Sequence, residues 1–549
     1  MQTTPNLIFH NAKIYTVNQE QPWTQAVAIR KHRIIAVGDD ADILALADDD
    51  TQLIDLGGQL MLPGLCDAHI HFLEWCLSQQ DVLLDDCTSR AEMMARIAER
   101  SANSADDVWI LGKGWNESRW GETEFPTADD IDQVTGPNQP AIFWRSDMHG
   151  AVANRAALRA AGITADTPDP EGGVIDRDAQ GEPNGILREL ALSLIAKHLP
   201  EPTVDEIDRA MKMGMAMLHS MGITAIHDQR MKNEDDGPAC LAAYQRLRRA
   251  KELHLRVNTN VAALNLPNVV ALGLHTGFGN DYLRLGHVKV FTDGSLGSRT
   301  ALMLEPFEKL SSDEEDNYGV YLTPPEQMAQ EFRQATESGF PISVHAIGDG
   351  ANRLCLDIFE ELAAAGLQPT IPHRIEHAQT VHPDDLARFR DLDITASVQP
   401  IHVTDDMDTA DLLLGDRAAH MYNFRTLTDM GVLLALGSDG PVANVNPYLG
   451  IHAAVCRQRV ERMDQAPWYG DERLTMAETI AGYTLDAAKA AGWNSVIGSI
   501  EVGKRADLVV LDRNLFEFEN VETQALSGDE IAGTKVVMTV FDGAIVYRG

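Results

Sequence analysis

Two histidines end an apolar run, LMLPGLCDAHIH at 60–71, where His69 and His71 stand two positions apart. Side chains of a strand alternate between its two faces, so both imidazoles would project to one side and Ile70 to the other. Imidazoles that converge in this way are common ligands of transition metals. An isolated pair more often bonds to backbone carbonyls, so the metal hypothesis needs further ligands elsewhere in the chain.

A lysine raises a second chemical question. In GHVKVFTDG (286–294), strand alternation puts Lys289 on one face together with His287, Phe291 and Asp293. A buried ammonium is costly, so this lysine must be paired, lose its proton or be chemically altered. A neutral lysine can add carbon dioxide and become a carbamate, which offers oxygen atoms to a metal.

The elements that position these residues alternate regularly. Apolar strand-like runs that end in polar residues are separated by helical stretches such as PEQMAQEFRQATESG and ANRLCLDIFEELAAAG. With the run that ends at His71 there are eight, and the other seven lie at 224–229, 255–262, 286–294, 341–349, 373–379, 394–400 and 433–441. Eight buried strands alternating with helices predict an α/β fold, a (β/α)8 TIM barrel, whose reactive groups lie at the carboxyl ends of the strands.

The spacing of the polar residues agrees with this barrel. A barrel of about 250 residues gives about 31 residues to each strand–helix unit. His345 and His377 lie 32 positions apart, close to one unit, whereas His71 and His227 lie 156 positions apart. The excess of about 125 residues over one unit predicts a large insertion after barrel strand 1, at about 78–205.

Both ends of the chain are rich in short segments of β-branched residues. NLIFHNAKIYTV lies near the start and KVVMTVFDGAIVYRG at the finish, where Asp542-Gly543 is typical of a tight hairpin turn. Such short strands do not form a stable sheet alone. We therefore expect a small β-sandwich module formed by both termini, from 1–59 and 491–549, with the barrel at 60–490 between them.

Composition restricts the class of protein. The chain of 549 residues has 82 acidic and 45 basic side chains, a net charge of −37. This excess repels phosphate backbones and anionic lipid headgroups, so neither nucleic acid nor membrane is an expected partner. The six cysteines show no Cys-x-x-Cys spacing, and no basic region precedes the first apolar residues. Both features favour a soluble, cytoplasmic protein with reduced thiols.

Several motifs taken together resemble a known family. The chain resembles the amidohydrolase superfamily in the combination of DAHIH, VKVFTDGSLGSRTA, VHAIGD, RIEHAQ and GSDGPV. Within it, the chain is similar to the amidohydrolase-3 branch, which includes N-substituted formamide deformylase and YtcJ-like proteins. The likeness extends to WILGKGWNESRW and FWRSDMHGAVANRAAL in the insertion and to the tail GSIEVGKRADLVVLD. These motifs are specific for the branch and much less so for a substrate.

The resemblance implies a metal centre with six ligands, which are His69, His71, Lys289, His345, His377 and Asp439. The first two histidines and Asp439 would hold one ion, the other two histidines a second, and a carboxylated Lys289 would bridge the two. Zinc is the preferred metal, and the ligand types also admit Mn²⁺, Fe²⁺ or Co²⁺. The sequence leaves the number of bound ions open at one or two. An unmodified Lys289 could not bind a metal, and a single ion would then be favoured.

The chemistry of such a centre follows from the effect of a metal on water. The metal lowers the pKa of a bound water from about 15.7 toward about 7 and polarises a carbonyl placed against it. Asp439 would be the catalytic residue that takes the water proton and later returns it to the departing amine. Taken alone, Asp439 in SDGP is equally typical of a turn, and its five matching partners favour the catalytic interpretation.

Four further residues are candidates for contact with the substrate. The resemblance suggests Trp115 and His149, in the insertion, although a packed tryptophan and a loop histidine fit the sequence equally well. Asp293 would orient a ligand or cap GSLGSR, and Gln399 would contact substrate from the end of the seventh strand. The remaining histidines that we expect to be structural or at the surface are His227, His275, His402, His420 and His452.

Three functional hypotheses follow. The favoured one is a metal-dependent hydrolase that cleaves the C–N bond of an amide or N-substituted formamide, a bond other than a peptide bond. The nearest alternative is a deaminase or cyclic-amide hydrolase on the same scaffold. The third is a non-catalytic metal-binding scaffold, against which the joint presence of Lys289 and Asp439 argues. The expected partner is a small-molecule substrate. The sequence does not decide whether the protein forms a homodimer.

Overall fold

The computed structural model divides the chain into two compact units. The described residues are 4–79, 81–84, 87–105, 108–120, 125–145, 150–170, 173–230, 236–309, 311, 314–518 and 528–549. One unit, here called the barrel unit, comprises 1–75 and 212–549. The other, here called the insertion unit, comprises 76–211.

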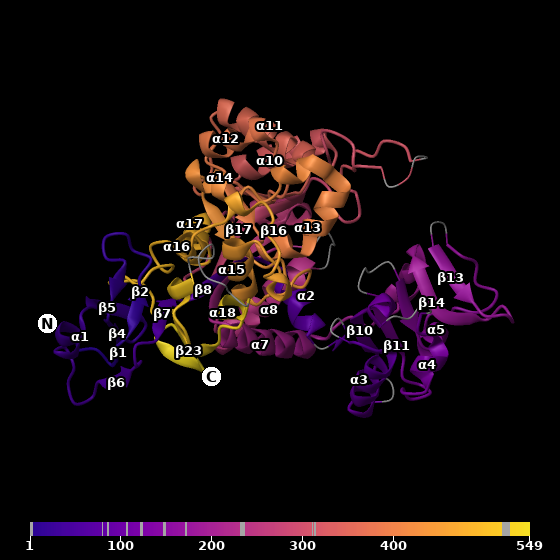
Figure 1. Cartoon of the computed structure of the whole chain (residues 1–549), viewed down its shortest axis with the longest axis horizontal. Helices are drawn as coiled ribbons and strands as arrows, with labels where there is room; N and C mark the ends of the chain where they lie inside the picture. The colour runs from indigo at the N-terminus through magenta and orange to yellow at the C-terminus, as the bar shows by residue number, and fades with distance from the viewer. Residues whose placement is uncertain are drawn as a thin grey trace. The chain divides into compact units, whose positions relative to one another are not determined.

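An eight-stranded, all-parallel sheet is the centre of the barrel unit (Figure 1). Its strands, in chain order, are β8 (Leu65–Ile70), β15 (Ile223–Asp228), β16 (Arg256–Ala262), β17 (Leu283–Phe291), β18 (Ile342–Ala346), β19 (Arg374–His377), β20 (Thr395–Val398) and β21 (Leu434–Leu436). A parallel bridge between Ile70 and Gly440 returns the last strand to the first. The expected (β/α)8 barrel is confirmed, and each of the eight predicted strands is present.

Helices follow the barrel strands along the chain and lie around the sheet (Figure 1). They are α7 (Val204–Ser220), α8 (Asp236–Ala250), α9 (Leu266–Ala271), α10 (Pro325–Glu337), α11 (Asp349–Ala364), α12 (Pro383–Asp391), α13 (Ile401–Leu414), α14 (Phe424–Asp429), α15 (Pro447–Cys456), α16 (Met476–Gly482) and α17 (Leu485–Ala490). In α11, Ala351, Cys355 and Leu362 are buried at helical spacing, which is how an amphipathic helix covers a sheet. Within the described part of the chain, no helix combines the length and apolar character needed to cross a bilayer.

The barrel interior is polar, whereas Val, Ile and Leu usually fill such interiors. The fully buried guanidinium of Arg374, on β19, donates to His227 Nδ1 on β15 (2.8 Å) and to Glu376 Oε2 (3.0 Å). A buried charge is stable only with partners of this kind. This network therefore ties β15 to β19 through the middle of the barrel.

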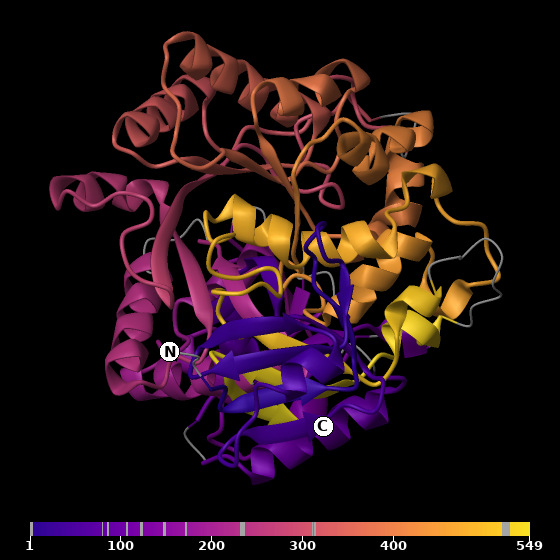
Figure 2. The same cartoon turned by 90° about the vertical axis from the view of Figure 1, so that its left-hand side faces the viewer.

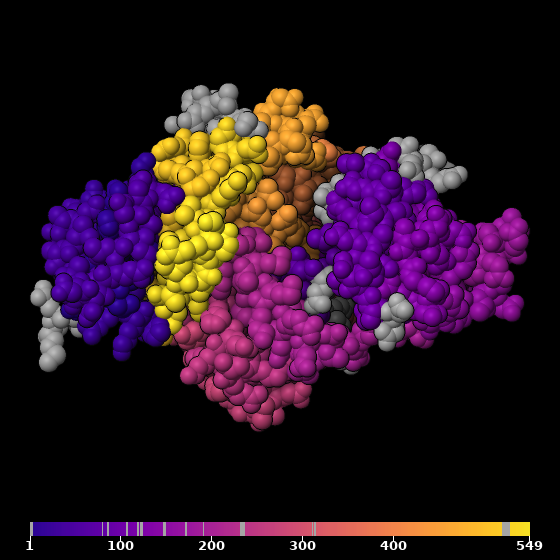
Figure 3. All heavy atoms as spheres, turned by 90° about the horizontal axis from the view of Figure 1, so that it is seen from below, coloured from indigo at the N-terminus to yellow at the C-terminus, as the bar shows by residue number. Residues whose placement is uncertain are grey.

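The two chain ends form a β-sandwich in which indigo and yellow segments lie side by side (Figures 2 and 3). One sheet has the order β5 (Arg33–Gly38), β4 (Ala26–Arg30), β1 (Leu7–His10) and β6 (Gln52–Asp55). The other has the order β24 (Ala544–Arg548), β23 (Val536–Phe541), β22 (Leu508–Leu511), β7 (Leu60–Pro63), β2 (Lys13–Tyr15) and β3 (Trp23–Thr24). Phe9, Leu508 and Val540 share one buried core. The predicted module formed by both termini is confirmed.

A buried arginine joins this module to the barrel. Arg256, at the start of β16, is fully buried, and its Nη2 donates to Asp507 (2.9 Å) and Asp542 (3.0 Å) of the C-terminal segment. Removing either partner would leave charge uncompensated in the interior, which is strongly destabilising. The contacts therefore hold the C-terminal strands against the amino-terminal end of the barrel. Two short helices, α1 (Asp40–Leu44) and α18 (Asp529–Ala532), complete these segments.

The insertion unit has a sheet of its own, preceded by α2 (Phe72–Ser78). Its strand order is β13 (Gly173–Arg177), β14 (Pro183–Glu189), β12 (Gly150–Ala153), β11 (Ala141–Arg145), β10 (Ile110–Trp115) and β9 (Val82–Leu83). The accompanying helices are α3 (Arg90–Ala102), α4 (Ala128–Asp132), α5 (Arg155–Ala160) and α6 (Ser193–Ala196). Side chains around Phe143 and around Leu187 form two buried clusters. The large insertion predicted after barrel strand 1 is therefore present as a unit with its own core.

Candidate metal centre

The candidate ligands meet where the barrel closes. Asp439 N donates to His69 O (2.7 Å), and His71 N donates to Gly440 O (2.8 Å). These two bonds join the residues that follow β21 to the carboxyl end of β8. Closure of the barrel therefore places Asp439 directly beside both histidines, although they lie far apart in sequence.

The Asp439 carboxylate is the shared neighbour of the two histidines. Its Oδ1 lies 3.3 Å from His69 Nε2 and 3.4 Å from His71 Nε2. The donor atoms of His69, His377 and Asp439 all lie within 4.8 Å of one another. Burial opposes ionisation of Asp439, but the neighbouring histidines hold the pKa of its carboxyl well below the usual range. A carboxylate among imidazoles is a donor set suited to a divalent transition metal.

His345, on β18, lies next to His377. The ring centroids of these two histidines are 4.6 Å apart, and those of His69 and His377 are 4.9 Å apart. His345 Nε2 lies 3.1 Å from the carbonyl oxygen of Gly294, so Nε2 carries the proton and Nδ1 the lone pair. Burial lowers the pKa of His345 to about 3, which keeps the ring neutral, the form that binds metals.

Lys289 is buried inside the barrel, as the strand alternation predicts. Its side chain lies over the Phe291 ring, with Nζ 4.9 Å from the ring centroid. Burial lowers the pKa of Lys289 to about 8, although Glu376 and Asp439 oppose this shift. A measurable fraction of the amine is then neutral near pH 7, and the neutral amine is the form that can add carbon dioxide.

Nitrogen atoms without partners test whether these residues fit a metal. Among the candidate ligands, four buried nitrogens make no hydrogen bond to any described residue, and these are His69 Nε2, His71 Nδ1, Lys289 Nζ and His377 Nδ1. Buried polar atoms without partners are rare in native proteins and costly when they occur. A divalent cation accepts the lone pairs of such nitrogens. The residues present therefore fit the metal that the donor set suggests.

Glu376 orients the first histidine, and the sequence analysis missed it. The buried carboxylate accepts a hydrogen bond from His69 Nδ1 (2.7 Å), so His69 presents the lone pair of Nε2 to the site. Burial raises the pKa of the Glu376 carboxyl, but Arg374 and His69 outweigh this effect and hold it well below the usual range. The sequence feature that could have revealed Glu376 is the RIEH motif, in which this acidic residue directly precedes His377.

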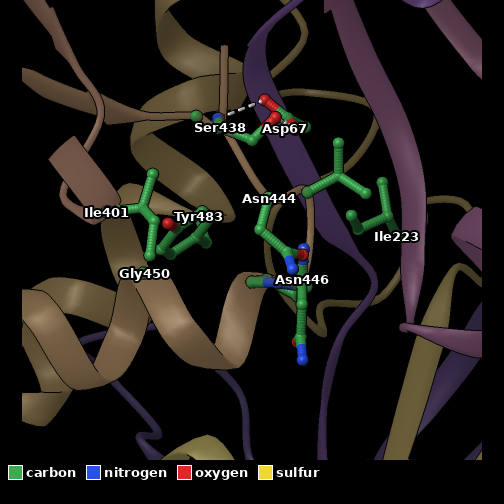
Figure 4. A pocket seen from close by; sticks show the side chains of 11 residues that line it. Asp67, Ile223, Ile401, Ser438, Asn444, Asn446, Gly450 and Tyr483 are labelled. Carbon is green, nitrogen blue, oxygen red and sulfur yellow. Dashed lines mark hydrogen bonds between the residues drawn. The ribbon is translucent and has the colours of Figure 1, made fainter. Parts of the chain in front are cut away.

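Asp67 connects the carboxyl end of β8 to the segment after β21 through hydrogen bonds to their backbone. Its Oδ1 accepts from His69 N (3.1 Å) and Ser438 N (2.9 Å), and its Oδ2 accepts from Ser438 Oγ. Burial raises the pKa of Asp67 to about 6. The carboxylate also borders a cavity of about 10 Å³, large enough for one water molecule, between β8 and α15 (Figure 4). Asp67 thus links the backbone of the two segments that carry the candidate ligands His69, His71 and Asp439.

The backbone is strained at two of the candidate ligands. His377 and Asp439 have φ angles of 74° and 64°, and Ala378 has a φ of 42°. Residues other than glycine seldom adopt this left-handed region, which costs about 1–3 kcal/mol each and persists where the surroundings impose it. Such residues cluster at functional sites, and here they turn the chain sharply at the ends of β19 and β21.

Two of the proposed substrate contacts lie in the barrel unit. The buried Asp293 carboxylate accepts from the backbone of Leu302 (2.8 Å), Ile347 (3.1 Å) and Gly348 (2.9 Å), and it lies 3.6 Å from His345 Nε2. It thus organises the loops after β17 and β18 around His345. Gln399 is buried after β20, and its Nε2 donates to Ser397 O (3.2 Å).

The other two proposed contacts belong to the insertion unit. Trp115 is fully buried in that unit, where its Nε1 donates to Phe143 O (2.8 Å) and its ring meets Phe125 edge-on. These contacts make Trp115 a core side chain of the insertion unit, and its contact with substrate stays a prediction. His149 lies outside the described residues.

Comparisons with known proteins agree with this geometry. Residues 52–547 match the family model described as Amidohydrolase family. The protein LONG AFTER FAR-RED 3 of Arabidopsis thaliana is 34% identical over 93% of this chain and 88% of its own length. N-substituted formamide deformylase of Arthrobacter pascens is 27% identical over 99% of this chain and 98% of its own. An uncharacterised metal-dependent hydrolase from Pyrococcus furiosus superposes with a TM-score of 0.75 at 26% identity, over 93% of this chain and 99% of its own.

A closed (β/α)8 barrel with clustered imidazoles and a carboxylate at its carboxyl rim defines a metal-dependent hydrolase of the amidohydrolase superfamily. The family match covers nearly the whole chain. This chain belongs to the amidohydrolase family, in the amidohydrolase-3 branch that its motifs resemble.

Proposed function

We propose that this protein hydrolyses the C–N bond of an amide or N-substituted formamide, with Asp439 as the residue that moves the proton. The observation that carries the proposal is the position of Asp439, whose Oδ1 lies 3.3 and 3.4 Å from the two histidines of the β8 segment. A carboxylate there is both a ligand candidate and a base at the reaction centre. The formamide deformylase that matches nearly the whole chain supports a C–N bond as the target.

The bound ion and Asp439 have different roles in the proposed reaction. A divalent ion, when bound, activates a water molecule and polarises the substrate carbonyl. Asp439 is ionised near pH 7 because its histidine neighbours outweigh the effect of burial on its pKa. It accepts a proton from water and returns it to the nitrogen as the C–N bond breaks. The products are then a carboxylic acid, which is formic acid for a formamide, and an amine.

Zinc is the ion that we assign to the site. Its donors would be imidazole nitrogens, a carboxylate and the carbamate of a modified lysine. His69, His71 and Asp439 would hold one ion, and His345 and His377 a second. A carboxylated Lys289 would supply oxygen atoms between them. A carbamate carbon signal in ¹³C NMR after exchange with labelled bicarbonate, absent from Lys289→Met, would test this modification. A signal that persists in the variant would place the carbamate elsewhere.

The main experiment combines metal analysis with a substrate screen. Elemental analysis of protein purified without chelators comes first, followed by formamides, acyl-amides and cyclic amides monitored for amine release. Asp439→Asn is expected to lower kcat by at least about 10²-fold, since a positioned acid or base contributes about 10² to 10⁴. The matched control is Asp464→Asn, because Asp464 is largely exposed. Amide hydrolysis that survives Asp439→Asn or exhaustive chelation would refute the proposal.

The same screen separates the alternative functions. A deaminase would release ammonia from aminated heterocycles and leave the amides unchanged. A non-catalytic metal-binding scaffold would turn over no substrate in the screen, even with metal bound. Both outcomes differ from the expected amine release, so a single set of measurements distinguishes the three functions.

A further inference from the structure

His402 is a largely buried imidazole at the rim for which the sequence analysis expected no role in the site. It lies in the first turn of α13, directly after β20, and its backbone N–H donates to Gln399 O (3.1 Å). Its side chain is only 13% exposed. The carboxyl ends of barrel strands and the segments that follow them are where reactive groups gather in this fold.

The His402 ring faces the metal centre. It lies nearly parallel to the His377 ring, with an angle of 8° between the planes and 6.1 Å between the centroids. Its Nε2 lies 3.9 Å from Asp439 Oδ2. The other carboxylate oxygen, Oδ1, faces His69 and His71. The two oxygens of Asp439 therefore have different neighbours.

His402 Nε2 is buried and makes no hydrogen bond to any described residue. A buried nitrogen of this kind usually has a partner, so the absence of one requires an explanation. Coordination of a metal does not supply it, because His402 is not one of the six ligands that the family resemblance implies. Nε2 instead points toward the oxygen of Asp439 that the histidine ligands leave open.

The separation of these two atoms allows one substrate atom to reach both of them from the side. A nitrogen or oxygen placed about 2.9 Å from both His402 Nε2 and Asp439 Oδ2 would hydrogen-bond each of them. The atom that receives the proton from Asp439 must lie within hydrogen-bond reach of that carboxylate. In hydrolysis of a C–N bond, this atom is the departing nitrogen.

We propose that His402 is a catalytic residue that hydrogen-bonds the departing nitrogen of the substrate and positions it against Asp439 Oδ2. The proposal rests on the C–N hydrolysis proposed above. It adds a substrate contact from the β20–α13 connection, on the side of Asp439 away from the β8 histidines. Because Nε2 acts through a hydrogen bond to substrate, it does not serve as a metal ligand.

Two substitutions separate a hydrogen-bonding role from a packing role. His402→Phe keeps a flat ring against His377 and removes the polar atom, whereas His402→Gln loses the ring but places an amide near the position of Nε2. A substrate contact predicts that kcat falls by about 10- to 100-fold in the phenylalanine variant and recovers in part in the glutamine variant. A packing role predicts the opposite order. The control His275→Phe alters an exposed histidine of the same unit.

Two readouts besides activity complete the test. The metal content and the visible spectrum of the Co²⁺-substituted protein are expected to be the same in the wild type and both variants. Acetohydroxamic acid, used as a metal-binding probe with an N–H group, is expected to bind about 10-fold more weakly to His402→Phe, because one hydrogen bond is lost. An altered Co²⁺ spectrum, or equal probe affinity in wild type and His402→Phe, would overturn the proposal.

Failure of the proposed reaction and failure of this inference give different results. A wild type that hydrolyses no amide contradicts the proposed function, and the probe measurement still decides the role of His402. An active wild type with unchanged kcat in His402→Phe contradicts the His402 inference alone. With an active wild type, the loss in the phenylalanine variant should be smaller for anilides than for alkylamides, because a better leaving group needs less help at nitrogen.

Discussion

At the scale of single residues, the candidate metal centre depends on side chains that hold its candidate ligands in place. Glu376 fixes the tautomer of His69 through a hydrogen bond of 2.7 Å to Nδ1. Arg374 and Ser343 hold Glu376 in turn, so the carboxylate has little freedom to move. Loss of a partner of this kind typically lowers metal affinity or activity by about 10- to 100-fold.

The substitution Glu376→Gln tests this support. Glutamine keeps the shape but weakens the charge-assisted bond to His69, so metal affinity is expected to fall by about 10- to 100-fold. Competition with a chelator of known affinity measures the change. Ser343→Ala is the matched control, since it removes one hydrogen bond of Glu376 and leaves its contact with His69. Equal affinity of Glu376→Gln and wild type would show that His69 needs no such support.

Lys289 permits a prediction in which stability and metal binding change in opposite directions. The substitution Lys289→Met removes a buried amine that has no hydrogen-bond partner among the described residues. The metal-free protein is expected to gain roughly 1 kcal/mol in the free energy of unfolding, because methionine avoids the burial cost of the amine. The metal content is expected to fall. Urea unfolding of the metal-free proteins and elemental analysis would detect both effects, and a loss of stability would contradict this view of Lys289.

At the scale of elements, the site is assembled where the first and last barrel strands meet. The hydrogen bonds between the segments after β8 and β21 bring Asp439 to His69 and His71. Asp67 reinforces this junction, since its carboxylate accepts from the backbone of both segments. The stability of the rim and the binding of metal are therefore coupled through one junction.

A pair of variants at Asp67 tests the coupling. Asp67→Ala leaves two buried backbone N–H groups without an acceptor and is expected to cost about 3 kcal/mol of stability, given about 1–3 kcal/mol for each such group. Asp67→Asn keeps an acceptor oxygen and is expected to cost much less. Denaturant unfolding and metal titration of the two variants provide the comparison. If alanine and asparagine behave alike, the backbone hydrogen bonds of Asp67 do not hold the rim.

At the scale of the whole molecule, buried neutral histidines link folding to pH. His219, on α7, is buried and donates from Nε2 to His254 O (2.7 Å) beside the C-terminal strands. Burial lowers its pKa to about 4. Thr539 Oγ1 donates to His219 O, so this residue lies where barrel and terminal module meet. Its protonation state therefore affects the stability of the barrel unit.

Acidification is expected to destabilise the protein through this histidine. The unfolded chain takes up a proton at His219 near pH 6.5, whereas the folded chain does so only near pH 4. Stability is thus full above pH 6.5 and is lost as the pH falls toward 4, by about 2 kcal/mol between pH 7 and pH 5. Urea unfolding at both pH values would show a smaller loss in His219→Gln. An unchanged loss would mean that His219 does not contribute.

Sequence reasoning succeeded where strand geometry alone decides the outcome. Parallel strands bring their carboxyl ends to one rim, so eight apolar runs ending in polar residues predicted both the barrel and the place of its site. It missed Glu376 and left the surroundings of His402 undetermined, because both depend on which atoms meet across elements. His402 lies in a helix whose orientation the sequence pattern does not specify, and Glu376 meets His69 from 307 positions away.

By itself, the sequence of this protein determined its eight-stranded barrel and its terminal β-sandwich, because the periodicity of a strand controls which side chains share a face. The resemblance of its motifs to the amidohydrolases implied the residues that could bind a metal. Only the tertiary structure decided how those residues are held. The closure of β8 on β21, the carboxylates of Glu376 and Asp67 and the position of His402 all depend on contacts between distant segments, whose geometry arises only when the barrel is packed.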